Sequence, residues 1–132
     1  MDKTVEEKTK KTASLYFEGW KEERPYSLWQ SFDKDLARDF SLFITGKLYS
    51  RELLAHPVRQ LCTIAALTAL ERTDELKLHI HAGLNVGCPP EEITEAIFQM
   101  ATYAGMPAVN SALKAYREVL QARNMWPLKS NR

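Results

Sequence analysis

The sequence is short of cysteine and of net charge. Its 132 residues include two cysteines, and 18 Lys and Arg side chains stand against 17 Asp and Glu, which gives a formal net charge of +1. Two cysteines are too few for a disulfide-stapled scaffold. A near-neutral chain also lacks the basic excess of a dedicated nucleic-acid-binding protein. With 45% hydrophobic residues, the composition is that of a globular protein rather than a disordered chain.

Long apolar runs are also missing. The longest stretch without a charge, residues 96–113, contains Gln99, Asn110 and a Gly-Met-Pro break, so it is unsuited to a bilayer. Residues 1–8 are rich in charge and no apolar segment follows them, so no secretory signal is visible. We therefore expect a soluble cytoplasmic protein whose thiols stay reduced.

Apolar residues recur at helical spacing, and no segment alternates with the period of a strand. The length suits one domain, so we predict a single all-α domain of about six helices over residues 1–132. The predicted helices run from Asp2 or Thr4 to before Pro25, from Ser31 or Asp33 to Gly46, from Pro57 to about Glu71, from Thr73 to Gly87, from Pro89 to near Gly105, and from Pro107 through Leu120. The uncharged run 60–70 is apolar nearly all round, which predicts a central helix. One core of this size is modest, so oligomerisation is expected.

The three histidines are candidates for acid–base chemistry. Glu75 precedes His79 by one helical turn, so both lie on one face, where a carboxylate can fix the imidazole tautomer and raise its pKa. On spacing alone, an exposed helical ion pair is the simpler interpretation. His81 lies about 200° around the helix from His79 and would meet another subunit or solvent. His56 precedes Pro57 in a predicted loop, where an ordinary exposed histidine is expected.

The chain has neither a metal-binding motif nor a CxxC redox motif. We expect Cys62, inside the apolar run, to be a small core residue. Cys88 is placed at a helix N-terminus, which lowers a thiol pKa, but Glu91 and Glu92 oppose that effect, so a reactive thiol is the less favoured alternative.

Two further features stand out. Arg59 is the one cation between residues 57 and 70, and a buried arginine needs an anion, either a carboxylate of the protein or a substrate. Residues 103–110 contain a Gly-Met-Pro corner followed by Asn110 in an otherwise apolar helix, where its amide needs a hydrogen-bond partner.

This corner resembles a family signature. Residues 103–110, YAGMPAVN, are similar to the YAGxPAxN motif of the carboxymuconolactone decarboxylase family. Residues 61–70 resemble its LxTIAALxAL helix, residues 75–79 its ELxxH motif, and residues 85–93 its NxG and EEI elements. The similarity extends from about Phe32 to Leu120.

The resemblance implies an all-helical homo-oligomer, commonly a hexamer, with a trimer as the smaller possibility. It also implies cofactor-independent decarboxylation of gamma-carboxymuconolactone (4-carboxymuconolactone), or of a similar small acidic lactone, in the beta-ketoadipate pathway of aromatic catabolism. His79 would donate the proton and Glu75 would orient it. The substrate-binding positions implied by the resemblance are Arg59, Tyr103, Asn110 and His81.

A second branch of the family, similar to alkyl hydroperoxidase D, carries CxxC before the histidine and a glutamate further upstream. Here those positions are Arg72, Glu75 and Gln60, which disfavours a thiol peroxidase. Related decarboxylases often have an Asp-Arg pair and an Arg where this chain has Ala55, His56 and His81. The alternative to a lyase is therefore a helical oligomer that binds a small ligand or a partner without turnover.

Overall fold

Prolines begin several of the helices, because their fixed φ suits the first turn and their missing N–H is not needed there. The computed structural model describes residues 2–129, all of whose regular structure is helical. Its helices are α1 (Asp2–Phe17), α2 (Pro25–Gln30), α3 (Lys34–Ser41), the π-helix η1 (Leu42–Tyr49), α4 (His56–Ala69), α5 (Thr73–Asn85), α6 (Pro90–Gln99), α7 (Ala101–Ala104) and α8 (Met106–Ala122). The predicted all-α, single-domain class is confirmed.

The N-terminal third differs from the prediction. The first helix ends at Phe17 rather than before Pro25, because the chain turns at Gly19, whose φ is +84°. Pro25 then begins the short helix α2, which the sequence analysis does not predict. The Asp33 carboxylate does cap α3, accepting a hydrogen bond from the Leu36 N–H at 3.0 Å. Helix α3 continues directly into η1, which extends past Gly46, where the sequence predicts the end of the helix.

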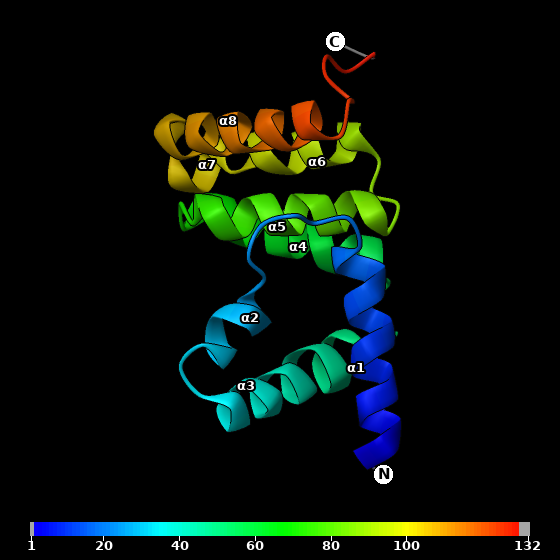
Figure 1. Ribbon diagram of the computed structural model, residues 1–132. Helices are drawn as coiled ribbons and strands as arrows, with labels where there is room; N and C mark the ends of the chain where they lie inside the picture. Colours follow the sequence, from blue (N-terminus) through cyan, green and yellow to red (C-terminus); the bar gives the residue numbers. More distant parts are fainter. Residues whose placement is uncertain (1, 130–132) are drawn as a thin grey trace.

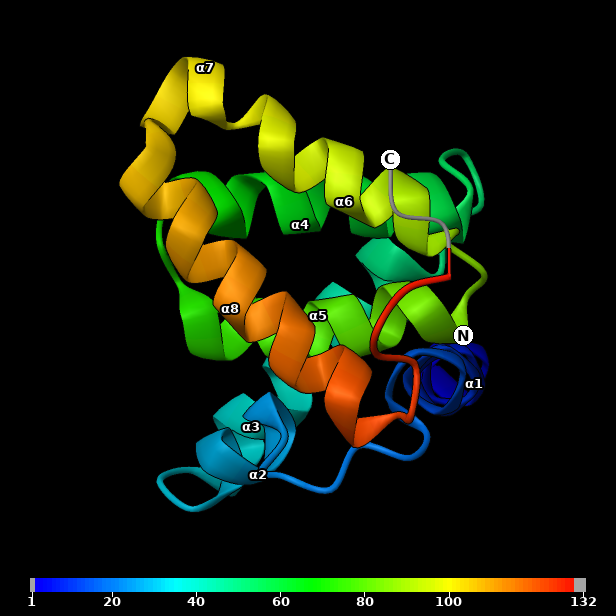
Figure 2. The same ribbon diagram turned by 90° about the horizontal axis from the view of Figure 1, so that it is seen from above.

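The helices form stacked layers (Figure 1). Helices α6, α7 and α8 lie on one side of the α4–α5 layer, and α2 and α3 lie on the other. Helix α1 passes across the end of the α4–α5 layer and packs against both α5 and η1. Seen from above, α8 crosses over α5 while α6 runs beside α4 (Figure 2). Residues 123–129, which follow α8, are not helical.

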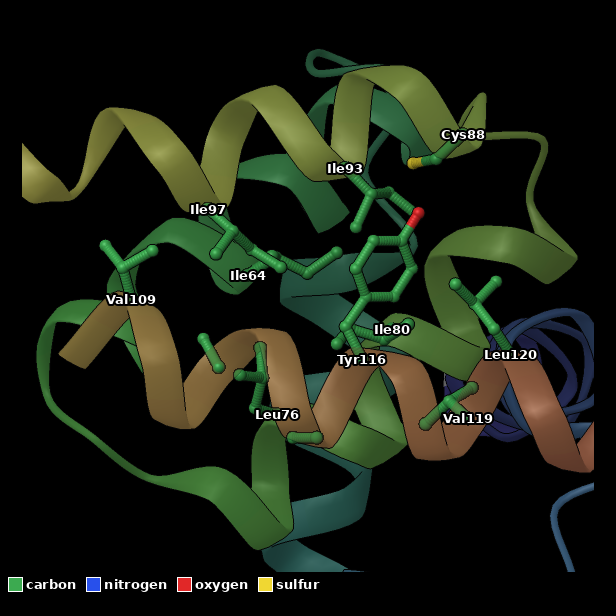
Figure 3. Close-up of a cluster of buried hydrophobic side chains, with 12 residues drawn as sticks. Ile64, Leu76, Ile80, Cys88, Ile93, Ile97, Val109, Tyr116, Val119 and Leu120 are labelled. Atoms are coloured by element: carbon green, nitrogen blue, oxygen red, sulfur yellow. The ribbon is translucent and has the colours of Figure 1, made fainter. Parts of the chain in front are cut away.

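The hydrophobic core lies between α4, α5, α6 and α8 (Figure 3). Tyr116 points into it from α8, and its hydroxyl donates to the Pro90 carbonyl at 2.8 Å. The fully buried aliphatic residues of the hydrophobic core include Ile64, Leu76, Ile80, Ile93 and Ile97.

The central helix is α5, not α4. Six residues of α5 are buried: Leu76, Leu78, Ile80, His81, Ala82 and Gly83. Helix α4 buries only Gln60, Ile64 and Thr68, all on one face. Its other side exposes a row at i, i+4, i+8 and i+12, consisting of Val58, Cys62, Ala66 and Leu70. The prediction of a central helix at 58–71 is therefore wrong for the single chain.

Among residues 2–129, no helix combines the length and the apolar composition needed to cross a bilayer.

Gly46 allows α1 and η1 to approach closely. A Cβ at this position would lie 2.1 Å from the Thr9 hydroxyl oxygen and 3.1 Å from the Val5 carbonyl oxygen. That hydroxyl already donates to the same carbonyl at 2.7 Å. Only glycine therefore fits without moving α1.

We predict that Gly46→Ala lowers the free energy of unfolding by about 1–3 kcal/mol, because the added methyl group overpacks this contact. Urea unfolding measures the change. The exposed neighbour Lys47 provides a control, since Lys47→Ala should shift stability by no more than about 0.5 kcal/mol. Adding Thr9→Ala to Gly46→Ala should restore part of the loss. Equal stability of Gly46→Ala and the wild-type protein would show that α1 is not held at this contact.

Candidate functional site

A cavity of about 710 Å³ opens between α1, α2, α3 and η1, and His79 reaches it from α5. Its walls are largely aromatic and aliphatic, and include Phe17, Trp29 and Tyr49. Its charged lining residues are Glu6, Lys10, Arg24 and Arg38. This volume is typical of sites for small organic ligands.

Two of the four charges neutralise each other. Arg38 forms an ion pair with Glu6. Arg24 donates to the Phe17 carbonyl at 3.0 Å, and its guanidinium carbon lies 5.9 Å from the centre of the Phe17 ring. Lys10 has no carboxylate partner within residues 4–129. The cavity therefore keeps an excess of positive charge that a bound anion would offset.

His79 is one of the residues that line this cavity. Its Nδ1 is 3.0 Å from Oε1 of Gln60, a fully buried residue of α4. The edge of the ring also meets Phe17, with 6.4 Å between ring centres and an interplanar angle of 77°. Burial lowers the pKa of His79 to about 4 because it removes water from the charged form. The imidazole is therefore neutral at pH 7.

The expected pairing of Glu75 with His79 does not form. Glu75 is exposed on α5, and His79 Nδ1 is hydrogen-bonded to the Gln60 side-chain oxygen instead. The two residues share a broad helix face, as their spacing predicts, but His79 turns inward toward α4. The pKa is accordingly lowered by burial, not raised by a carboxylate.

Among the described residues, Arg59 forms no ion pair with a carboxylate, and it does not line the cavity. It donates to the Arg51 carbonyl at 2.9 Å and lies over the ring of Tyr49, 5.8 Å from its centre. Its Nε is buried without a hydrogen-bond partner among the described residues. Since Tyr49 lines the cavity, Arg59 supports that wall from behind.

His81 is buried and does not line the cavity, although the family resemblance implies a place for it among the substrate-binding residues. Its Nε2 lies 2.7 Å from the Glu18 carbonyl, and its Nδ1 lies 2.9 Å from Arg123. The ring also packs against Trp20, with 5.3 Å between ring centres. His81 therefore fixes the turn after α1 against α5 and α8.

The Tyr103–Asn110 corner does not meet His79 either. Gly105, with φ of +87°, turns the chain between α7 and α8, and none of residues 103–110 lines the cavity that contains His79. Tyr103 is 74% exposed. Asn110 is exposed rather than held in the core, and it lines a second cavity of about 670 Å³ between α6, α8 and residues 126–128. Neither of the two cavities joins His79 with Arg59 or Tyr103.

The two cysteines lie in different environments. Cys62 is exposed because it lies on the outer row of α4, so its prediction as a core residue is wrong. Cys88 is 3% exposed, and its thiol donates to the Pro57 carbonyl at 3.2 Å. Burial, reinforced by Glu92, raises the pKa of Cys88 to about 11, which opposes thiolate chemistry at this residue.

His56 is also not the ordinary exposed histidine that was expected. It is half-buried, and its Nδ1 lies 2.5 Å from the hydroxyl of Tyr16. Tyr16 and Gln60 were not recognised as site residues from sequence. Gln60 did carry a signal, because a polar side chain in an otherwise apolar helix needs a partner in the core.

Within residues 2–129, no three His, Cys, Asp or Glu side chains are grouped as a metal site would require. The arrangement instead suits binding of a small organic anion beside a buried imidazole. The fold and site thus define a class: a small all-helical protein with one histidine facing a cationic, aromatic-walled cavity.

Comparison with known proteins identifies the family within this class. The sequence model described as "Carboxymuconolactone decarboxylase family" matches residues 34–118. The chain is 39% identical over 101 residues to the 4-carboxymuconolactone decarboxylase of Acinetobacter baylyi, covering 76% of this chain and 75% of that protein. The chain therefore belongs to the carboxymuconolactone decarboxylase family.

A second relative is named only by its position in a genome. It is the uncharacterized 15.0 kDa protein of the nqo9-nqo10 intergenic region in Paracoccus denitrificans. It is 37% identical over 76 residues, which cover 56% of this chain and 57% of the relative.

The lowered pKa of His79 predicts a pH-dependent stability. In the unfolded chain the imidazole gains a proton below about pH 6.5, whereas in the folded chain it does so only near pH 4. The stability contributed by neutral His79 is therefore complete above about pH 6.5 and is lost as the pH falls toward 4. The loss is at most about 3 kcal/mol.

Urea unfolding of wild type and His79→Asn at pH 7.5, 5.5 and 4.5 checks this. Asparagine can keep the hydrogen bond to Gln60 but cannot titrate. We expect the wild-type protein to lose more stability on acidification than the variant. His81, whose pKa burial also lowers, contributes equally to both proteins. Parallel losses would contradict the buried neutral state of His79.

Proposed function

We propose that this chain is a carboxy-lyase that decarboxylates 4-carboxymuconolactone or a similar small acidic lactone without a cofactor. The observation that carries the proposal is the neutral, largely buried His79 at the end of a cavity with excess positive charge. The identity to a 4-carboxymuconolactone decarboxylase over three quarters of each chain supports the same reaction class.

The cavity lining suits a planar ring that carries carboxylates. Aromatic and aliphatic side chains offer flat apolar surface to the ring, while Lys10 and Arg24 offer cations for the carboxylates or the lactone oxygen. These two residues take the role that the resemblance implied for Arg59. A cation near the lactone carbonyl would also stabilise the negative charge that develops there in the transition state.

Proton donation requires His79 to be charged, and the carboxylate of an anionic substrate can stabilise that charged form. With a pKa near 4, protonating the ring at pH 7 costs about 4 kcal/mol in the free protein. One carboxylate placed about 4 Å away contributes about 4 kcal/mol at an effective dielectric constant of about 20. The two magnitudes match, so substrate binding can bring the imidazole to its working protonation state.

The reaction then balances as follows. The bond between the ring carbon and the substrate carboxylate breaks and releases CO2, and its electron pair moves through the unsaturated ring to the lactone carbonyl. The resulting dienolate takes a proton from the His79 imidazolium at the carbon beside the carbonyl. His79 returns to its neutral state and takes up its next proton from solvent when the next anionic substrate binds.

We predict that the purified protein releases CO2 from 4-carboxymuconolactone and that His79→Asn lowers kcat by about 10²-fold or more, as loss of a general acid does. Arg24→Leu should raise KM instead, because it removes binding charge and leaves the imidazole in place. CO2 release and the loss of lactone absorbance measure both constants.

Two exposed residues of α5 provide controls. Asp74→Asn should leave kcat unchanged, and Glu75→Gln should do the same because Gln60 holds the imidazole. A wild-type protein without turnover would contradict the proposal. If only Glu75→Gln lost kcat, the Glu75 carboxylate, and not Gln60, would be the group that orients His79.

The alternative remains a family member that binds a small anion without decarboxylating it. It is favoured by one observation, namely that Arg59 and Tyr103 stay outside the cavity. Under this alternative, a lactone or related carboxylate would bind with an affinity that depends on Lys10 and Arg24, but no CO2 would be released.

We further propose that copies of the chain assemble through the outer row of α4. This row is apolar along its whole length, and Val58 and Leu70 are 46% and 62% exposed. A helix that is apolar all round is normally buried on all sides. The outer row of α4 therefore needs a partner surface that the single chain does not supply. A second copy of the chain can supply it, because its own outer row is equally apolar.

Light scattering should give the mass of a homo-oligomer, with a hexamer expected and a trimer as the smaller assembly. Ala66→Asp places a charge in the middle of the outer row of α4 and should shift the mass toward smaller species. Lys47→Glu, an exposed change on η1, is the matched control and should leave the mass unaltered. A monomeric wild-type protein would contradict the assembly.

A further inference from the structure

A row of polar side chains lies behind His79, on the side away from the cavity. Gln60 of α4 and Tyr16 of α1 are both fully buried, and His56 begins α4 next to them. The two distances that fix the row are 3.0 Å from His79 Nδ1 to Gln60 Oε1 and 2.5 Å from the Tyr16 hydroxyl to His56 Nδ1. The rings of Tyr16 and His56 also meet edge to face, with 5.1 Å between their centres.

The direction of these hydrogen bonds follows from the chemistry of each atom. An amide oxygen can only accept, so the His79 Nδ1 beside it must carry the hydrogen. The neutral ring then has its lone pair on Nε2. Had the amide of Gln60 been reversed, its NH2 group would face Nδ1, and the hydrogen would have to sit on Nε2. The orientation of one buried amide therefore decides the tautomer of His79.

Tyr16 and His56 favour the observed orientation. The other end of the Gln60 amide, Nε2, is buried and has no partner of good hydrogen-bond geometry among the described residues. Burial raises the pKa of Tyr16, and hydrogen bonding from the Gln60 side chain opposes that rise. If the Tyr16 hydroxyl donates to His56 Nδ1, its oxygen is free to accept from the amide. The donors then follow one order along the row: His79 donates to Gln60, Gln60 donates to Tyr16, and Tyr16 donates to His56.

We infer that Gln60, oriented by Tyr16 and His56, is a positioning residue that holds His79 as the Nδ1–H tautomer and leaves Nε2 for the ligand in the cavity. Its consequence for catalysis rests on the proposed function, since Nε2 is then the atom that gains and delivers the proton. The tautomer itself is a property of the free protein and needs no substrate.

The packing of α1 against α4 therefore influences Nε2 of His79 through hydrogen bonds. Tyr16 belongs to α1, whereas Gln60 and His56 belong to α4 and His79 to α5. Removing the Tyr16 hydroxyl leaves the Nε2 of the amide with an apolar neighbour, so both orientations of Gln60 approach equal free energy. His79 should then populate both tautomers.

Nitrogen NMR of protein labelled with ¹⁵N-histidine measures this directly, because protonated and unprotonated ring nitrogens differ strongly in chemical shift. His79→Asn assigns the signals by their loss. At pH 7 the wild-type protein should show His79 with Nδ1 protonated and Nε2 bare. Tyr16→Phe should move both signals toward intermediate shifts. Thr68→Val, on the same buried face of α4, is the matched control and should change neither.

His56→Ala provides a second variant, because it alters a half-buried position at the start of α4 and is less able to disturb the core. It removes the acceptor for the Tyr16 hydroxyl and should shift the same signals in the same direction by a smaller amount. A bare Nδ1 in the wild-type protein would overturn the inference. So would unchanged His79 signals in folded Tyr16→Phe and His56→Ala.

The result is separable from the outcome of the decarboxylation assay. An Nδ1–H tautomer in a protein without turnover would contradict the proposed function alone. An active enzyme with a bare Nδ1 would contradict the positioning role alone. In an active enzyme, Tyr16→Phe should lower kcat with little change in KM, since it alters the tautomer and leaves the cationic wall in place.

Discussion

The burial of one imidazole between α1, α4 and α5 is the constraint on which the site depends. Phe17 of α1 packs against the His79 ring, and Gln60 is hydrogen-bonded to Nδ1 of that ring. The contact with Phe17 requires α1 to remain docked on η1, where Gly46 allows the two helices to meet. The hydrogen bond with Gln60 joins α5 directly to α4. The cavity and the burial of His79 therefore both depend on the docking of α1.

The proposed function couples charge to binding. Burial keeps the imidazole of the free protein neutral. A bound anion would be attracted by Lys10 and Arg24 and would in turn favour the charged imidazole. A neutral ligand of the same shape would gain from the aromatic walls but would leave His79 unprotonated. On this proposal, the site would distinguish acidic ligands from neutral ones at the step where the proton is needed.

Much of the fold follows from local sequence signals. Pro57, Pro90 and Pro107 each lie in the first turn of a helix, near its predicted start. The outer row of α4 was read as core, because an apolar pattern cannot say whether the same chain or another copy covers it. Helix α2 was missed because its six residues are too short for a periodic pattern.

The site was less predictable because its contacts are long-range. Sequence motifs found His79, but its spacing from Glu75 established only a shared helix face. The residue that holds the ring lies 19 positions away on another helix, and the bond between Tyr16 and His56 joins residues 40 positions apart. Such pairs follow from how α1, α4 and α5 pack, which no local pattern in the sequence encodes.

The central claim is that binding of an anion converts a neutral buried His79 to its charged form. Calorimetric titration with an unreactive dicarboxylate analogue of the lactone, repeated in buffers of different ionisation enthalpy, counts the protons taken up on binding. At pH 7 the wild-type protein should take up close to one proton per bound ligand, and His79→Asn should take up almost none. Tight binding to the wild-type protein without proton uptake would contradict the account.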